Sequence, residues 1–95
     1  MEITINLTIE KSQTRLAGFP YGEKLYKEQV ESHINYEAHN IIVIPPQIEK
    51  VASSFVQGFF AKLVEEIGYV RILEIVEIKA ATDTLVNDIW SKLPD

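Results

Sequence analysis

The stretch Ile41-Ile42-Val43-Ile44, closed by Pro45-Pro46, is the strongest indication of how this chain folds. Four consecutive β-branched residues favour an extended strand, and an uninterrupted apolar run is typical of a strand covered on both faces. Proline has no N–H to donate to a neighbouring strand, so the two prolines mark where the strand ends. We therefore predict a central strand at residues 41–44.

The chain before this strand predicts a second strand, a loop and a helix. Residues 2–10 alternate between apolar and polar side chains, which is the period of a strand with one face covered. Its apolar positions are Ile3, Ile5, Leu7 and Ile9. Residues 12–22 hold two glycines and a proline and predict an irregular loop. Residues 23–35 carry apolar side chains at helical spacing and predict a helix.

The chain after the central strand predicts a long amphipathic helix at residues 54–67. Its apolar positions recur at helical spacing; they are Val56, Phe59, Phe60, Leu63, Val64 and Ile67. Ser54 stands three residues before Gln57, the spacing of a capping box, so we expect the Ser54 side chain to cap the helix. Gly68 follows the last apolar position and predicts a left-handed cap at the other end.

Two further elements complete the chain. Residues 70–78 contain six Val, Ile or Leu and predict a strand, although their periodicity also permits a helix. Thr82 and Asp83 offer a helix cap, and a last helix follows them with the apolar positions Leu85, Val86, Ile89, Trp90 and Leu93. The spacing of strands 41–44 and 70–78 around a helix suits a parallel βαβ unit. We predict one α/β domain over residues 1–95, with a mostly parallel or mixed sheet of three to four strands and helices packed on it.

Composition excludes several classes of function. With 14 acidic and 9 basic residues among 95, the chain has a net charge of -5, which disfavours contacts with nucleic acid or an anionic membrane. The sequence has no cysteine, which excludes disulfides, thiolate nucleophiles and cysteine-bearing metal sites. No signal peptide, membrane-spanning segment or cofactor motif is recognisable, so we expect a cytoplasmic protein without a cofactor.

Ser53 and Ser54 are the first candidates for a functional site. They lie at the predicted start of helix 54–67, where free backbone N–H groups and the helix dipole stabilise a negative group. The pair therefore suits a phosphate, either bound or carried on a serine. The alternative is that Ser54 is only a cap and Ser53 only a loop residue.

The strand 41–44, the run Ser53-Ser54-Phe55-Val56-Gln57-Gly58-Phe59-Phe60 and Gly68 before another β-branched segment resemble the STAS domains. These are the anti-sigma-factor antagonists and related domains, and the chain is most similar to a branch called STAS-like domains of unknown function. The resemblance covers most of residues 38–79. It implies a STAS-like fold and a regulatory domain that binds a protein partner through the N-terminus of helix 54–67.

The resemblance also implies a role for Ser53. In that family the first hydroxyl residue of Asp-Ser-Ser-Gly is phosphorylated by a serine kinase with the fold of histidine-kinase-like ATPases, and Ser53 occupies this position. Ser54 occupies the position of the second serine, while Ala52 and Phe55 stand where the family has Asp and Gly. Such an ATPase is therefore the partner that the resemblance implies.

Arg15 is the remaining candidate. On a glycine-rich loop its guanidinium suits a carboxylate or phosphate, which leaves open a small anion-binding domain or enzyme that uses Arg15 and Ser53. A homodimer or structural homo-oligomer also stays open, because the aromatic side chains of helix 54–67 form a wide apolar arc. His33 and His39 lack the spacing of a metal site, and neither serine lies in a nucleophile elbow. We expect a binding domain rather than an enzyme, with no metal.

Overall fold

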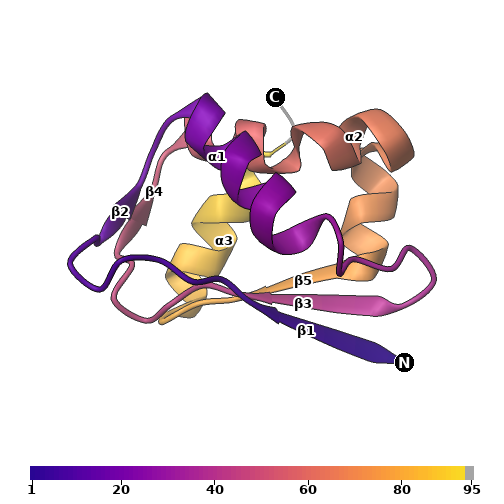
Figure 1. The fold of residues 1–95 in the computed structure, drawn as a ribbon, viewed down its shortest axis with the longest axis horizontal. Coiled ribbons are helices and arrows are strands. Elements are labelled where there is room, and N and C mark those ends of the chain that lie inside the picture. Colours follow the sequence, from indigo (N-terminus) through magenta and orange to yellow (C-terminus); the bar gives the residue numbers. More distant parts are fainter. Residues whose placement is uncertain (94–95) are drawn as a thin grey trace.

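The structure is a computed structural model that describes residues 1–93. Its elements alternate between strands and helices along the chain (Figure 1). In chain order they are β1 (Glu2–Asn6), β2 (Arg15–Leu16), α1 (Phe19–Leu25), the π-helical turn η1 (Tyr26–Val30), β3 (His39–Val43), β4 (Lys50–Val51), α2 (Ser53–Ile75), β5 (Val76–Lys79) and α3 (Asp83–Ser91).

Three parallel strands form the main sheet in the order β1-β3-β5, so the strand predicted at residues 41–44 is central. Ile5, Ile42 and Ile78 lie side by side across it. β2 and β4 form a second, two-stranded parallel sheet. Both strand connections of the main sheet contain a helix, as parallel pairing requires. The predicted α/β class and the parallel βαβ unit are therefore confirmed.

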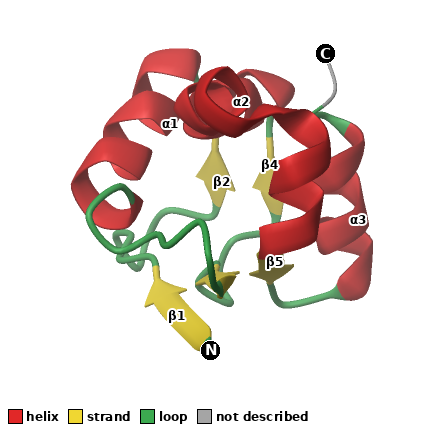
Figure 2. Cartoon of the chain, turned by 90° about the vertical axis from the view of Figure 1, so that its right-hand side faces the viewer, coloured by secondary structure: helices red, strands yellow, loops and turns green. Residues whose placement is uncertain are grey.

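The helices cover only one face of the main sheet, whereas the apolar run 41–44 predicted a strand covered on both faces (Figures 1 and 2). All three helices lie on the same side in both views, with α3 beside β5 (Figures 1 and 2). The opposite face carries mostly polar side chains because the flanking strands alternate. Its residues are Glu2, Thr4, Asn6, His39, Ile41, Val43, Glu77 and Lys79. Ile41 is nevertheless buried, at 6% exposure, between Thr4 and Glu77 of the neighbouring strands.

β1 ends at Asn6, earlier than the predicted strand 2–10. The last bond to β3 runs from the Leu7 N–H to the Val43 carbonyl, and β3 ends there. The Gln29 side chain then replaces a strand partner, because its amide accepts from the Thr8 N–H at 2.7 Å and donates to the Thr8 carbonyl at 2.9 Å. The predicted alternation persists beyond the strand, since Leu7 and Ile9 are buried like Ile5.

The first helical segment spans residues 19–30, not 23–35, and the predicted loop 12–22 contains β2 and the start of α1. Gly18 has a φ of 99°, a region that favours glycine, and Pro20 occupies the first turn of the helix, where its missing N–H costs nothing. The sequence prediction treated these residues as loop signals. They instead mark the helix start.

α2 continues to Ile75, so residues 70–75 are helical and only residues 76–79 of the predicted strand 70–78 form β5. Gly68 interrupts the helix with a φ of 82° and a ψ of 161°, a conformation nearly restricted to glycine. Gly68 therefore has a positive φ but not the left-handed conformation predicted for a helix cap, and the chain re-enters a helix after it. Within residues 1–93, no helix combines the length and apolar character needed to cross a membrane.

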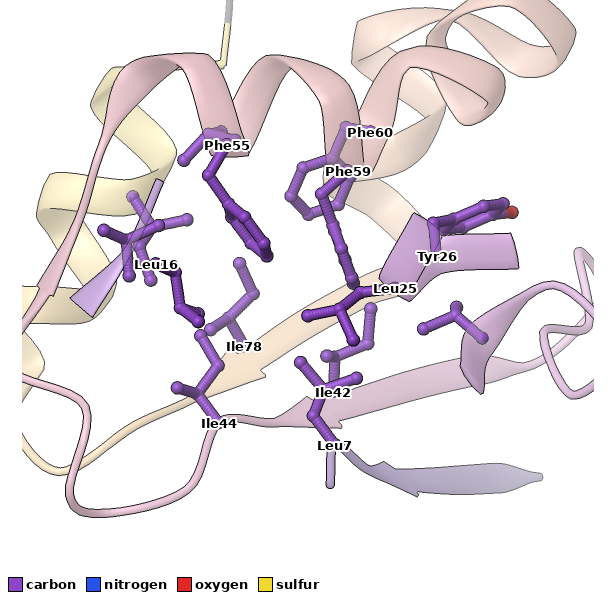
Figure 3. Close-up of a cluster of buried hydrophobic side chains, with 14 of the residues drawn as sticks. Leu7, Leu16, Leu25, Tyr26, Ile42, Ile44, Phe55, Phe59, Phe60 and Ile78 are labelled. Atoms are coloured by element: carbon purple, nitrogen blue, oxygen red, sulfur yellow. The ribbon is translucent and has the colours of Figure 1, made fainter. Parts of the chain in front are cut away.

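One apolar core lies between the sheet and the helices (Figure 3). Phe55, Phe59 and Phe60 project from α2 over Ile42 and Ile78, and the Phe55 and Phe59 rings stack at 5.6 Å. α1 packs closely on α2 because Gly58 has no side chain. A Cβ at this position would overlap the Phe19 carbonyl oxygen. The predicted apolar face of α2 is confirmed except at Val64, which is 41% exposed.

Candidate functional site

The starts of α1 and α2 lie side by side, and this brings the three predicted site residues to one end of the molecule (Figure 1). β2 leads into α1 and β4 leads into α2, and the two strands are paired and parallel. The Ala52 N–H also donates to the Leu16 carbonyl at 2.8 Å, which continues this pairing to the helix start. We call the residues here the helix-start surface; Arg15, Lys50, Ser53 and Ser54 are exposed, and Gly18 is half-buried.

Ser54 does not cap α2. The N-cap residue is Ala52, which has no capping side chain, and Ser54 is the second residue of the helix. The Ser54 Oγ instead accepts a hydrogen bond from the Gly18 N–H at 3.1 Å. The hydroxyl therefore joins the start of α2 to the start of α1. The capping-box prediction is wrong because the competing donor lies 36 residues away in the sequence.

Ser53 is the first residue of α2 and is exposed. Within residues 1–93 its hydroxyl has no hydrogen-bond partner. The first-turn N–H groups of a helix have no intrahelical acceptor, and no side chain among residues 1–93 caps them here. An anionic group beside the Ser53 hydroxyl would gain these donors and the positive end of the helix dipole.

Arg15 lies on β2 opposite Lys50 of β4. Leu16 and Val51, the next pair along these strands, are buried, so Arg15 and Lys50 share the exposed face. Neighbouring strands are about 5 Å apart, so two basic residues project from adjacent backbone positions on a chain with a net charge of -5. Sequence reasoning identified Arg15 but missed Lys50 and Gly18, because only the pairing of β2 with β4 brings them together.

The histidines lie at the other end of the sheet and cannot activate Ser53. His39 begins β3, and its Nε2 contacts the Glu77 carboxylate at 2.8 Å. His33 is exposed in the turn after η1. Among residues 1–93 no three His, Asp or Glu side chains are grouped to hold a metal ion. The helix-start surface therefore offers a hydroxyl, two cations and backbone donors, which suit binding and phosphoryl acceptance.

Comparison of the chain with protein-family models, curated proteins and solved structures finds no significant match. The resemblance to STAS-like domains thus rests on the sequence pattern alone.

Proposed function

We propose that this protein is a regulatory interaction domain that binds a protein partner through the helix-start surface. The observation that carries the proposal is the paired arrangement of the two helix starts, held by the bond from Gly18 to Ser54. It presents Arg15, Lys50 and Ser53 on one exposed surface. Such a surface favours an acidic segment of the partner, because its cations and uncapped N–H groups complement carboxylates.

Phosphorylation of Ser53 is the regulatory step in this proposal. The exposed hydroxyl would accept the γ-phosphoryl group of ATP from a partner of the histidine-kinase-like ATPase fold, with release of ADP and a proton. A phosphate on Ser53 adds up to two negative charges and would repel an acidic partner segment. The uncapped helix start and Arg15 would accommodate the phosphate without unfolding the domain.

Two residues set this chain apart from the phosphorylated family. Phe55 stands where the family has glycine, and its side chain is 3% exposed and packed against Phe59. Ala52 stands where the family has aspartate and is the N-cap residue. The Phe55 side chain therefore lies in the core and does not cover Ser53, which is exposed. Ala52 removes a carboxylate that would otherwise lie beside the proposed phosphate.

The test is the affinity of variants for a captured partner. Immobilised wild-type protein is used to isolate a binding protein from lysate, and its affinity is then measured by biolayer interferometry. Arg15→Ala and Ser53→Asp should each weaken binding about tenfold. Ser32→Asp, an exposed serine at the other end of the molecule, should not. Affinities of both helix-start variants equal to wild type would overturn the proposal.

Binding of a small anion is the second candidate function. The specific observation is the Arg15–Lys50 pair beside an uncapped helix start. Inorganic phosphate and small carboxylates should then raise the melting temperature of wild type and not of Arg15→Ala, since a ligand of the native state alone stabilises it. An equal rise in both proteins would exclude this site.

A further inference from the structure

β1 is an edge strand of the main sheet, and its outer side is open. The order β1-β3-β5 leaves one side of each outer strand unpaired within residues 1–93. β1 bonds to β3 through its odd-numbered positions, since the Met1 carbonyl and the Leu7 N–H both bond to that strand. The backbone groups of alternate residues in a strand point to opposite sides. Those that face the free edge therefore belong to Glu2, Thr4 and Asn6.

This edge is exposed and has little protection against pairing. Glu2, Thr4 and Asn6 are all exposed. Proteins commonly protect an open edge with proline, a bulge or charged side chains, but β1 has no proline and only one charged residue, Glu2. The open edge ends at Asn6, because the Gln29 side chain bonds to both backbone groups of Thr8. The five residues of β1 thus form a strand that another strand can join.

The other edge of the sheet is shielded. The Ile44 N–H donates to the Lys79 carbonyl, so the outward-facing backbone groups of β5 are those of Val76 and Ile78. These two residues are only 4% and 5% exposed, and both α2 and α3 contact β5 (Figure 2). An added strand is therefore expected at β1 rather than at β5.

We propose that β1 pairs with β1 of a second copy of this chain, antiparallel and centred on Thr4. A two-fold axis through Thr4, perpendicular to the sheet, relates the copies and makes one continuous sheet. The outward-facing groups of Thr4 then bond to those of Thr4 in the second copy, and Glu2 bonds to Asn6 in the same way. β1 contains none of the helix-start residues, so this pairing is separate from the partner binding proposed above.

The side chains of β1 favour a second copy as the occupant. In this register Ile3 lies opposite Ile5 of the second copy in a non-hydrogen-bonded pair, where cross-strand side chains are closest. Ile3 is half-buried in the single chain and would be covered by this contact. On the open face the Asn6 amide can donate to the Glu2 carboxylate, and no like charges lie opposite each other. The sequence Glu-Ile-Thr-Ile-Asn is therefore complementary to itself.

The test measures the mass of the full chain by sedimentation equilibrium from about 10 μM to about 1 mM. The mass should rise with concentration from the 10.8 kDa of one chain toward twice that value. Thr4→Pro removes an N–H that faces the free edge and that β3 does not use. It should weaken dimerisation by about tenfold or more, while its melting curve still shows a folded chain.

Variants of Asn6 test the register. Asn6→Lys places an ammonium group opposite Glu2 at both ends of the pair and should tighten the dimer about fivefold, whereas Asn6→Glu creates two like-charge contacts and should weaken it about fivefold. The matched controls are Asn87→Lys and Asn87→Glu, which change an exposed asparagine of α3 and alter the net charge by the same amount. They should leave the dimer unchanged.

Three results would overturn the proposal. The first is the mass of one chain throughout the concentration range, which would leave this edge to a strand of another protein. The second is a dimer of wild-type strength in folded Thr4→Pro. The third is Asn6 variants that dimerise like the matching Asn87 variants, and this comparison decides the question if Thr4→Pro does not fold.

Discussion

At the scale of single residues, the two adjacent serines have different surroundings and should respond differently to the same substitution. Ser54 accepts from the Gly18 N–H, whereas Ser53 has no partner in residues 1–93. Ser54→Ala should therefore lower the free energy of unfolding by about 0.5 to 1.5 kcal/mol, and Ser53→Ala should change it by less than about 0.5 kcal/mol. Urea denaturation curves of both variants measure the difference. Equal losses would mean that the bond to Gly18 contributes nothing.

At the scale of elements, the contact between α1 and α2 depends on Gly58. Replacing a glycine inside a helix by alanine ordinarily stabilises the helix by up to about 1 kcal/mol. Here the added methyl would overlap the backbone carbonyl of Phe19, which cannot rotate away as a side chain can. We expect Gly58→Ala to destabilise the protein by about 2 kcal/mol or more, measured by thermal and urea unfolding. A gain in stability would show that the helices lie farther apart.

The sheet-facing side of α2 provides a second test at this scale. Leu63 has no exposed surface and packs in the core between helix and sheet. Leu63→Ala removes apolar contacts and leaves a cavity, so it should cost about 2 to 5 kcal/mol. Val64→Ala on the same helix is the control and should cost much less, because Val64 is 41% exposed. Calorimetry of the two variants distinguishes them, and similar losses would contradict the packing described.

At the scale of the whole molecule, Asn40 holds separate parts of the chain together. It is fully buried, and its Nδ2 donates to the carbonyls of Asn35, Ala38 and Ile75 while its Oδ1 accepts from the Asn35 N–H. Asn40→Leu keeps the volume but leaves these groups without partners, so we expect a loss of about 3 kcal/mol. Asn6→Leu, on the exposed face of β1, is the control. Melting curves of Asn40→Leu should show a single unfolding transition at a lower temperature than wild type, since the protein has one core.

Part of the architecture follows directly from local patterns. The alternation through Ile3, Ile5, Leu7 and Ile9 predicted which side chains face the helices, and the β-branched run predicted the central strand. The last helix begins as expected, because the Thr82 Oγ1 accepts from the Leu85 N–H at 3.1 Å. These predictions succeeded because periodicity and helix capping depend on residues close in the sequence.

The candidate site was predicted only in part. Ser53, Ser54 and Arg15 do lie at one end of the molecule, but the partner of Ser54 and the neighbour of Arg15 come from other segments. A two-residue strand such as β2 carries no periodicity of its own. Its existence depends on the pairing with β4, which only the folded chain brings about.

Residues 70–75 show most clearly what the sequence determined and what the tertiary structure decided. Val70 to Ile78 carries apolar residues that fit both a strand and a helix, so local pattern could place an apolar element there but not choose its type. In the fold, Ile72 and Ile75 are buried on one side of a helix, and Arg71 donates to the Tyr36 carbonyl at 2.9 Å. The sequence determined the central strand, the buried face of the first strand and most of the apolar face of α2. The tertiary structure decided the conformation after Gly68, because the contacts that stabilise it come from residues far away in the chain.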